Sequence, residues 1–284
     1  MTQTETEIVV ATDGGSGSRA ALRWVADHLG ARAARVRIVT VADPSNPEVS
    51  IALTAAERAL GAIGAEWTVD AELLNGDPAH AIAEAAEGSS LVVVGARTGG
   101  GPLTSPRVPA KVAELAACPV VVVPDDWSPG PGPIAVGSSI DAASDNAVEL
   151  AAQIAEREGR ELLLVHAWEL PVVGDLPLAP GGSESIPDRQ REALDQIAGE
   201  VRRSHPGLEV SVDLRNGPAA SSLAAAAASA ALLIVGRRDR TAAARMLLGS
   251  VSHHVVSDPP CPVMVIPAPE PGIRTVSDIP DEGL

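Results

Sequence analysis

A loop near the end of the chain carries the residues best suited to hold a phosphate group. The apolar residues 232–235 end at Gly236, and a basic segment then leads to Gly249 and Ser250. Glycine lets backbone N–H groups approach an anion, a serine hydroxyl adds a donor, and the start of a helix adds partial positive charge. The spacing fits neither GxxxxGK[ST] nor GxGxxG, so the mechanism of neither motif can be transferred whole. The residue types therefore predict a phosphate cradle without naming its ligand.

The composition limits the fold that must position this loop. It also limits the kinds of partner that the protein can bind. A length of 284 residues predicts about two domains, and 45% hydrophobic residues supply a large core that Val, Leu, Ile and Ala must fill, because Phe and Tyr are absent. The formal charge of −16 argues against a nucleic-acid partner. Two cysteines are too few for a disulfide framework, so we expect them to be reduced. We find no signal region and no apolar run long enough for a membrane span, and we expect a cytoplasmic protein without a membrane partner.

Strand and helix patterns alternate along the first half of the chain. Apolar runs predict strands at residues 8–12, 36–41, 67–73, 91–94 and 120–123. Helical spacing predicts helices at residues 20–29, 51–63, 79–87 and 110–117. This alternation is typical of a parallel sheet that is covered by helices on both faces.

After a linker of Pro, Gly and Asp at residues 125–133, the same series begins again. The second half predicts strands at 134–137, 161–168, 209–214, 232–235 and 263–266, helices at 144–158, 188–203 and 219–230, and a long loop at 171–187. Gly76 and Gly95 recur as Gly217 and Gly236, both 141 residues later. We therefore predict two copies of one domain, with the boundaries 7–124 and 134–267, and a disordered tail at 268–284.

Four stretches in this order resemble the signatures of the universal stress protein family in its tandem two-domain form. They are residues 8–14 with Ser18 and 20–22; residues 76–79 with 81–82; Gly236-x2-Asp239-x9-Gly249-Ser250; and the pair 118–120 and 261–263. The resemblance implies two doubly wound, Rossmann-like α/β domains, each a five-stranded parallel sheet with helices on both faces. It also implies that ATP binds with adenine near the Asp of the first strand and with its phosphates on the G-x2-G-x9-G-[ST] loop. The last strands of family members pair across a dimer interface, so the two copies could pair within this chain, and a homodimer is possible.

The two halves depart from the family pattern in different ways. In the first half Asp13 is present, but Val108 and Pro109 fall at the Gly-Ser of the motif, where Pro109 has no N–H to donate. We expect this phosphate loop to be degenerate. In the second half Ser139 stands in place of Asp13, and Asp239 replaces the second Gly, which is unfavourable beside an anion unless Mg²⁺ or the arginines 237, 238 and 240 offset its charge. The alternative is an Arg-rich loop that makes surface ion pairs.

The residues that the resemblance implies for a nucleotide are thus divided between the halves. They are Gly236, Arg238, Asp239, Gly249, Ser250, Val251, Ser252, Ser138, Ser139 and Ala167 in the second, and Thr12, Asp13, Val41 and Gly95 in the first. Our leading hypothesis is an ATP-binding sensor or regulator of a stress response that requires no turnover, because the sequence offers no general base, P-loop Lys or pair of metal-binding carboxylates. A scaffold that acts through protein association without a nucleotide is the alternative, and slow ATP hydrolysis is a third possibility.

Other candidate residues favour structural roles. Asp13, Ser16 and Ser18 have no matching His for a triad, so helix capping is the better interpretation. The adjacent His253 and His254 point about 100° apart on a helix and do not make a two-His metal site. We expect the remaining candidates to lie in the core as inert groups: His166, Trp24, Trp168, Cys118 and Cys261. Trp127, in the linker, is expected to cover the seam between the copies.

Overall fold

The computed structural model describes residues 6–29, 34–42, 49–62, 67–97, 107–139, 145–169, 172–173, 176–177, 186–237 and 248–267. Contacts within the chain divide it into two compact units. Unit 1 consists of residues 1–129 and 237–284, and unit 2 consists of residues 130–236. The last helix and strand of the predicted second copy therefore belong to unit 1.

The sheet of unit 1 is parallel except for its last strand. Its strands are β1 (Glu7–Ala11), β2 (Ala34–Val41), β3 (Trp67–Leu74), β4 (Leu91–Ala96), β5 (Val120–Pro124) and β12 (Val263–Ile266). They lie in the order β12-β5-β4-β1-β2-β3, and β12 runs antiparallel to β5 with Val265 opposite Val120. The central strands are apolar on both faces because both faces are covered, as a parallel sheet requires.

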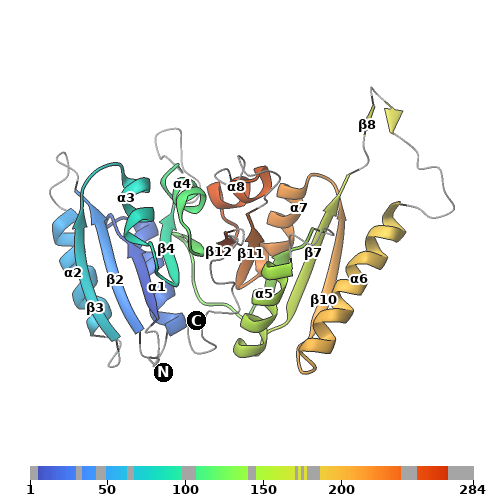
Figure 1. The fold of residues 1–284 in the computed structure, drawn as a ribbon, viewed down its shortest axis with the longest axis horizontal. Helices are drawn as coiled ribbons and strands as arrows, with labels where there is room; N and C mark the ends of the chain where they lie inside the picture. Colours follow the sequence, from blue (N-terminus) through green and yellow to red (C-terminus); the bar gives the residue numbers. More distant parts are fainter. Residues whose placement is uncertain are drawn as a thin grey trace. The chain divides into compact units, whose positions relative to one another are not determined.

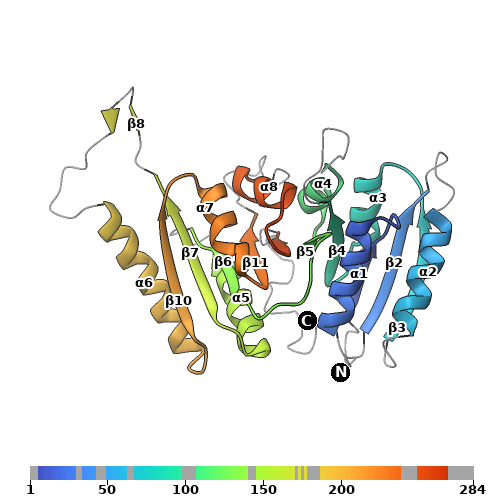
Figure 2. The ribbon, with the colours of Figure 1, turned by 180° about the vertical axis from the view of Figure 1, so that it is seen from behind.

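The described residues of unit 1 include five helices that pack around this sheet. They are α1 (Ser16–Leu29), α2 (Val49–Gly61), α3 (Pro78–Ala85), α4 (Arg107–Leu115) and α8 (Ser250–Ser257). Figure 1 shows α3 and α4 on the near face of the sheet, and Figure 2 shows α1 on the opposite face. The helix α1 buries Ala20, Ala21, Trp24 and Val25, a spacing that places them along one side of a helix.

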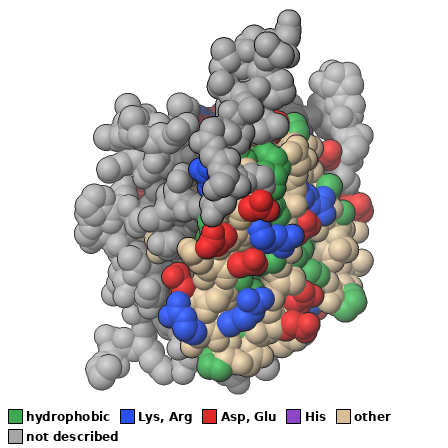
Figure 3. Space-filling view, turned by 90° about the vertical axis from the view of Figure 1, so that its right-hand side faces the viewer, with side chains coloured by type: hydrophobic (Ala, Val, Ile, Leu, Met, Phe, Trp, Pro, Cys, Tyr) green, Lys and Arg blue, Asp and Glu red, His purple; other side chains and the backbone are tan. Residues whose placement is uncertain are grey.

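In the described part of unit 2, four parallel strands form the sheet. They are β6 (Ile134–Gly137), β7 (Leu162–Trp168), β10 (Val210–Asn216) and β11 (Leu232–Gly236), in the order β10-β7-β6-β11. The helices are α5 (Asp145–Glu158), α6 (Ile186–Ser204) and α7 (Ala219–Ala226), and α7 continues into a 3₁₀ turn, Ala227–Ser229. The face of the molecule in Figure 3 has acidic and basic side chains interspersed, so the net acidic charge does not form a single-sign patch on its described part.

The predicted α/β architecture is confirmed, and the differences are local. The helix predicted from residue 110 begins at Arg107, because Pro109 lies in its first turn, where a missing N–H breaks no helical bond. Within the stretch predicted as a loop, the strands β8 (Val172–Val173) and β9 (Leu176–Pro177) form a short antiparallel pair. Trp24 is buried as expected, whereas Trp168 at the end of β7 is half-buried, so the prediction of a core position was wrong for that residue.

Candidate functional site

The turn after β1 uses the Asp13 carboxylate to organise itself. Oδ1 of Asp13 accepts hydrogen bonds from the Gly15 N–H at 2.8 Å and from the Ser18 hydroxyl at 2.8 Å. Gly14 has a φ of +76°, in the left-handed region that favours glycine. These bonds order the turn before α1, and the Ser16 hydroxyl donates to Oδ2 of Asp125 at 2.7 Å, so none of the three side chains accepts from an N–H of the first helical turn. One oxygen of the carboxylate predicted to face adenine is already engaged.

Gly95, the first glycine of the motif in the first half, lies against the backbone of α1. A Cβ atom added to Gly95 would stand 2.0 Å from the carbonyl carbon of Gly17, and one added to Gly17 would stand 2.9 Å from the Ala96 carbonyl oxygen. Helix α1 and strand β4 therefore touch backbone to backbone. Gly95 serves helix packing, a role that sequence reasoning missed because Gly17 gave no signal beyond a polar turn.

The other predicted residues of the first half lie at the same ends of their strands. Thr12 is buried, and its N–H donates to the Val39 carbonyl at 2.8 Å. Val41 is half-buried at the end of β2, opposite Leu74 of β3. Nothing in these contacts requires a ligand.

Four of the predicted phosphate-binding residues, Gly249 to Ser252, form the start of α8 in unit 1. Gly249 precedes the helix with φ −60° and ψ 154°, and its carbonyl accepts from the His253 N–H at 2.8 Å. Ser250 is exposed, Val251 half-buried and Ser252 buried. No side chain in the described part of the chain caps this helix at Gly249. The first turn of α8 therefore has the form of a helix start that can receive an anion.

Arg237, one of three arginines expected to offset Asp239, is directed to another helix of unit 1. Its Nη1 donates to the carbonyl oxygen of Glu114 at 2.8 Å and to that of Ala116 at 3.2 Å. These carbonyls end α4, where the helix dipole favours a cation. The backbone N–H of Arg237 donates to the Ile266 carbonyl at 2.8 Å. Arg238 and Asp239 lie outside the described residues.

In unit 2, the predicted base-binding residues follow β6 and β7. Ser138 is buried, its N–H donates to the Val165 carbonyl at 2.9 Å, and its carbonyl lies 2.8 Å from Nδ1 of His166. His166, expected in the core, is half-buried, as are Ser139 and Ala167. A Cβ atom added to Gly236 would meet its nearest described neighbour, the Ala147 Cβ, at 4.0 Å. Among the described residues, no backbone atom therefore lies as close to Gly236 as the α1 backbone lies to Gly95.

Ionisable groups elsewhere do not suggest a reactive centre. Burial raises the pKa of the Cys118 thiol to about 12, so the thiol stays protonated at neutral pH, consistent with the expected inert role. In the part of the chain that the structure describes, no group of three His, Cys, Asp or Glu side chains could hold a metal ion. None of the described helices combines the length and the apolar character needed to cross a membrane.

Comparisons with known proteins agree with this architecture. Residues 6–124 and 132–267 both match the model of the universal stress protein family. Universal stress protein Rv2005c of Mycobacterium tuberculosis is 31% identical over 287 residues, which cover 91% of this chain and 96% of that protein. The crystal structure of a universal stress protein from Archaeoglobus fulgidus matches with a TM-score of 0.66 at 20% identity, over 93% of this chain and 97% of that one. A universal stress protein solved in complex with cAMP matches 44% of this chain and 100% of its own, at 26% identity with a TM-score of 0.35. This chain belongs to the universal stress protein family.

Proposed function

We propose that this protein binds one adenine nucleotide per chain and acts as a sensor or regulator in a stress response, without a need for turnover. The observation that supports this most is the start of α8, where Gly249 leads into the helix without a side-chain cap. Phosphates prefer such helix starts because unpaired N–H groups and the helix dipole both favour an anion. The resemblance of Gly236-x2-Asp239-x9-Gly249-Ser250 to the family's nucleotide motif favours ATP over other anions.

The second copy supplies the proposed site. We assign the phosphates to Gly236, Arg238, Asp239, Gly249, Ser250, Val251 and Ser252, and the base to Ser138, Ser139 and Ala167. Mg²⁺ would offset the charge of Asp239 beside the phosphates. The first copy, with Thr12, Asp13, Val41 and Gly95, is the weaker candidate, because the α1 backbone fills the space beside Gly95 and Pro109 lacks an N–H.

The test uses a variant at the first residue of α8. Proline is tolerated at the first position of a helix, so Ser250→Pro removes the hydroxyl and the N–H while keeping the helix. Calorimetric titration with Mg-ATP, ADP and AMP should show tight binding for the native protein and about tenfold or greater loss for Ser250→Pro, the equivalent of one or two hydrogen bonds to a charged group. Ser250→Ala, which removes only the hydroxyl, should lose less. No nucleotide in the acid-soluble extract of the purified protein, together with no binding at millimolar Mg-ATP, would overturn the proposal.

A scaffold that acts through protein association is the second candidate. It is favoured by the antiparallel pairing of β5 with β12, since the last strands of the two predicted copies come together in unit 1. We include in this candidate the pairing of the two copies within the chain and the formation of a homodimer. Sedimentation at several protein concentrations, with and without Mg-ATP, separates the two functions. A nucleotide-independent assembly would favour the scaffold, and steady phosphate release abolished by Gly249→Ala would favour slow hydrolysis instead.

A further inference from the structure

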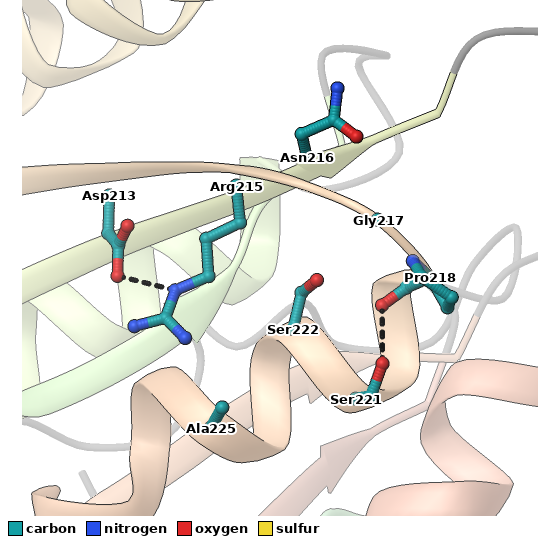
Figure 4. Close-up of a pocket in the computed structure, with 8 residues that line it drawn as sticks. All are labelled: Asp213, Arg215, Asn216, Gly217, Pro218, Ser221, Ser222 and Ala225. Carbon is teal, nitrogen blue, oxygen red and sulfur yellow. Dashed lines mark hydrogen bonds and ion pairs between the residues drawn. The ribbon is translucent and has the colours of Figure 1, made fainter.

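Unit 2 has a cavity that none of the proposed nucleotide residues lines. It measures about 520 Å³ and lies between the end of β10 and the first turns of α7 (Figure 4). Its lining residues are Asp213, Arg215, Asn216, Gly217, Pro218, Ser221, Ser222 and Ala225. A volume of this size accommodates a small organic ligand.

The guanidinium group of Arg215 is held in place within this cavity. Nε of Arg215 donates to Oδ2 of Asp213 at 2.8 Å, and the two side chains are only 33% and 30% exposed. In Figure 4 the Arg215 side chain extends from β10 toward α7. Both terminal Nη groups have no partner among the described residues. A guanidinium fixed through Nε presents these groups as a pair, the geometry that binds carboxylates and phosphates in a bidentate manner.

Helix α7 adds further donors beside the arginine. The Ser222 hydroxyl and the Ser221 backbone N–H have no partner among the described residues. The Ser221 hydroxyl is engaged, since it donates to the Pro218 carbonyl at 3.1 Å. The cavity therefore offers unused hydrogen-bond donors from both β10 and α7.

The equivalent turn of the first copy shows what kind of group fits there. Asp77 of that turn corresponds to Pro218, and the two residues precede their helices with the same ψ of 127°. The Asp77 carboxylate accepts from the His80 backbone N–H at 3.2 Å and contacts the His80 ring at 2.8 Å. The first copy thus carries its own anion at the helix start. The second copy has proline in its place, and it has Arg215 where the first copy has Leu74.

We propose that the cavity between β10 and α7 binds the phosphate group of a small phosphate monoester. The Arg215 Nη groups, the Ser222 hydroxyl and the Ser221 N–H bind the phosphate oxygens from several directions, which suits a tetrahedral group better than a planar carboxylate. The unpaired Oδ1 of Asp213 accepts a hydroxyl of the esterified alcohol. This site adjoins the proposed base-binding residues, because Arg215 pairs with Ala167 across β10 and β7, but it uses none of the residues assigned to the nucleotide.

The test follows the backbone amides of Gly217, Ser221 and Ser222 by NMR during titration with glycerol phosphate and with inorganic phosphate. We expect both ligands to shift these resonances, with glycerol phosphate binding more tightly. Arg215→Gln should weaken glycerol phosphate binding at least tenfold, the loss of a bidentate pair, and Arg215→Lys should weaken it less. Pro218→Asp restores the internal carboxylate of the first copy and should abolish binding. Arg191→Gln on α6 makes the same charge change outside the cavity and should have no effect.

The nucleotide variant separates the two proposals. Ser250→Pro should leave the shifts of Ser221 and Ser222 unchanged, so a failure of one site does not imply a failure of the other. The proposal is wrong if these resonances do not respond, or if their response persists in Arg215→Gln. Equal affinity for the two ligands would mean that the cavity binds an adventitious ion only.

Discussion

The two copies place the same motif glycine in opposite surroundings. At Gly95 the nearest atom to an added Cβ is the Gly17 carbonyl carbon at 2.0 Å, whereas at Gly236 it is a described Cβ, that of Ala147, at 4.0 Å. The reason lies in the helix that follows the first strand of each copy: α1 presents a glycine to its sheet, and α5 presents an alanine. One glycine permits close packing of a helix backbone, and the other makes no such backbone contact with a described helix.

The helices that follow the two loops, α4 and α8, also differ, in the N–H donors that their first turns offer. Pro109 lies in the first turn of α4 and removes one of its N–H donors, while α8 begins with Ser250 directly after Gly249. A helix start needs these donors to hold an anion. The same fold thus accommodates a proline in the first turn of one helix and a Gly-Ser start in the other, and a shared glycine does not by itself indicate a shared function.

The largest loss of stability is expected when a methyl group is added at Gly95, where the α1 backbone already fills the space. Gly95→Ala should lower the free energy of unfolding by about 3 kcal/mol, because the backbone of α1 must shift to admit the methyl group. Gly236→Ala should lower it by less than about 1 kcal/mol, since the same methyl group makes an ordinary contact. Urea unfolding followed by tryptophan fluorescence measures both, because Trp24, Trp67 and Trp127 report on unit 1 and Trp168 reports on unit 2, which contains Gly236. Equal losses in the two variants would contradict the comparison.

A somewhat smaller loss is expected at the residue that follows each glycine. Arg237 binds the last carbonyls of α4, while the first copy has the small Ala96 at the corresponding position. Arg237→Ala should lower the stability of unit 1 by about 2 kcal/mol, because it removes charge-assisted bonds to a helix end. Arg23→Ala provides the control, since Arg23 is exposed and makes a single long bond of 3.5 Å to the Trp127 carbonyl. A similar loss in both variants would mean that the contact with α4 has no special role.

The fold was predictable because its signals are local. Strands buried on both faces give apolar runs such as residues 91–94, and the repetition of these runs after 141 residues defines the second copy. The predicted start of α4 lies three residues too late, because Pro109 interrupts the helical pattern in the sequence although proline is tolerated in the first turn of a helix. The short pair of β8 and β9 has too few residues to leave a pattern.

The site was predictable only where the residues in contact lie close together in the sequence. The bond between Ser18 and Asp13 spans only five residues and lies within one polar turn that the sequence shows. The bond from Arg237 to the Glu114 carbonyl spans 123 residues, so the sequence pattern indicates Arg237 only as a positive charge near a phosphate loop. The packing of Gly17 against Gly95 is equally non-local. Such contacts depend on which helix covers which strand, and that is fixed only by the folded sheet.

A loss of about 1 kcal/mol is expected from Asp13→Ala, which removes the acceptor for the Gly15 N–H and the Ser18 hydroxyl. If the first copy binds no nucleotide, this variant should leave the affinity for Mg-ATP unchanged. Ser139→Ala, at the corresponding place in the second copy, should weaken Mg-ATP binding by about two- to tenfold, the contribution of one hydrogen bond. Thermal unfolding and calorimetric titration of both variants measure the contrast. A loss of nucleotide affinity in Asp13→Ala alone would move the site to the first copy.

The smallest effect concerns the anion that the first copy carries at the start of α3. The hydrogen bond from the His80 side chain, followed by that from the His80 backbone N–H, lowers the pKa of the Asp77 carboxyl. Because the folded pKa lies below the unfolded one, the stabilisation by this cap is complete above the unfolded pKa and is lost as the pH falls through the folded pKa. Asp77→Ala should therefore lower the urea midpoint at pH 7, and the difference from the native protein should vanish in acid. Asp77→Asn keeps an acceptor that does not titrate, so its midpoint should not show this pH dependence. A constant difference between Asp77→Ala and the native protein across the pH range would show that the carboxylate charge does not contribute, and would weaken the argument that an anion is favoured at the matching turn of the second copy.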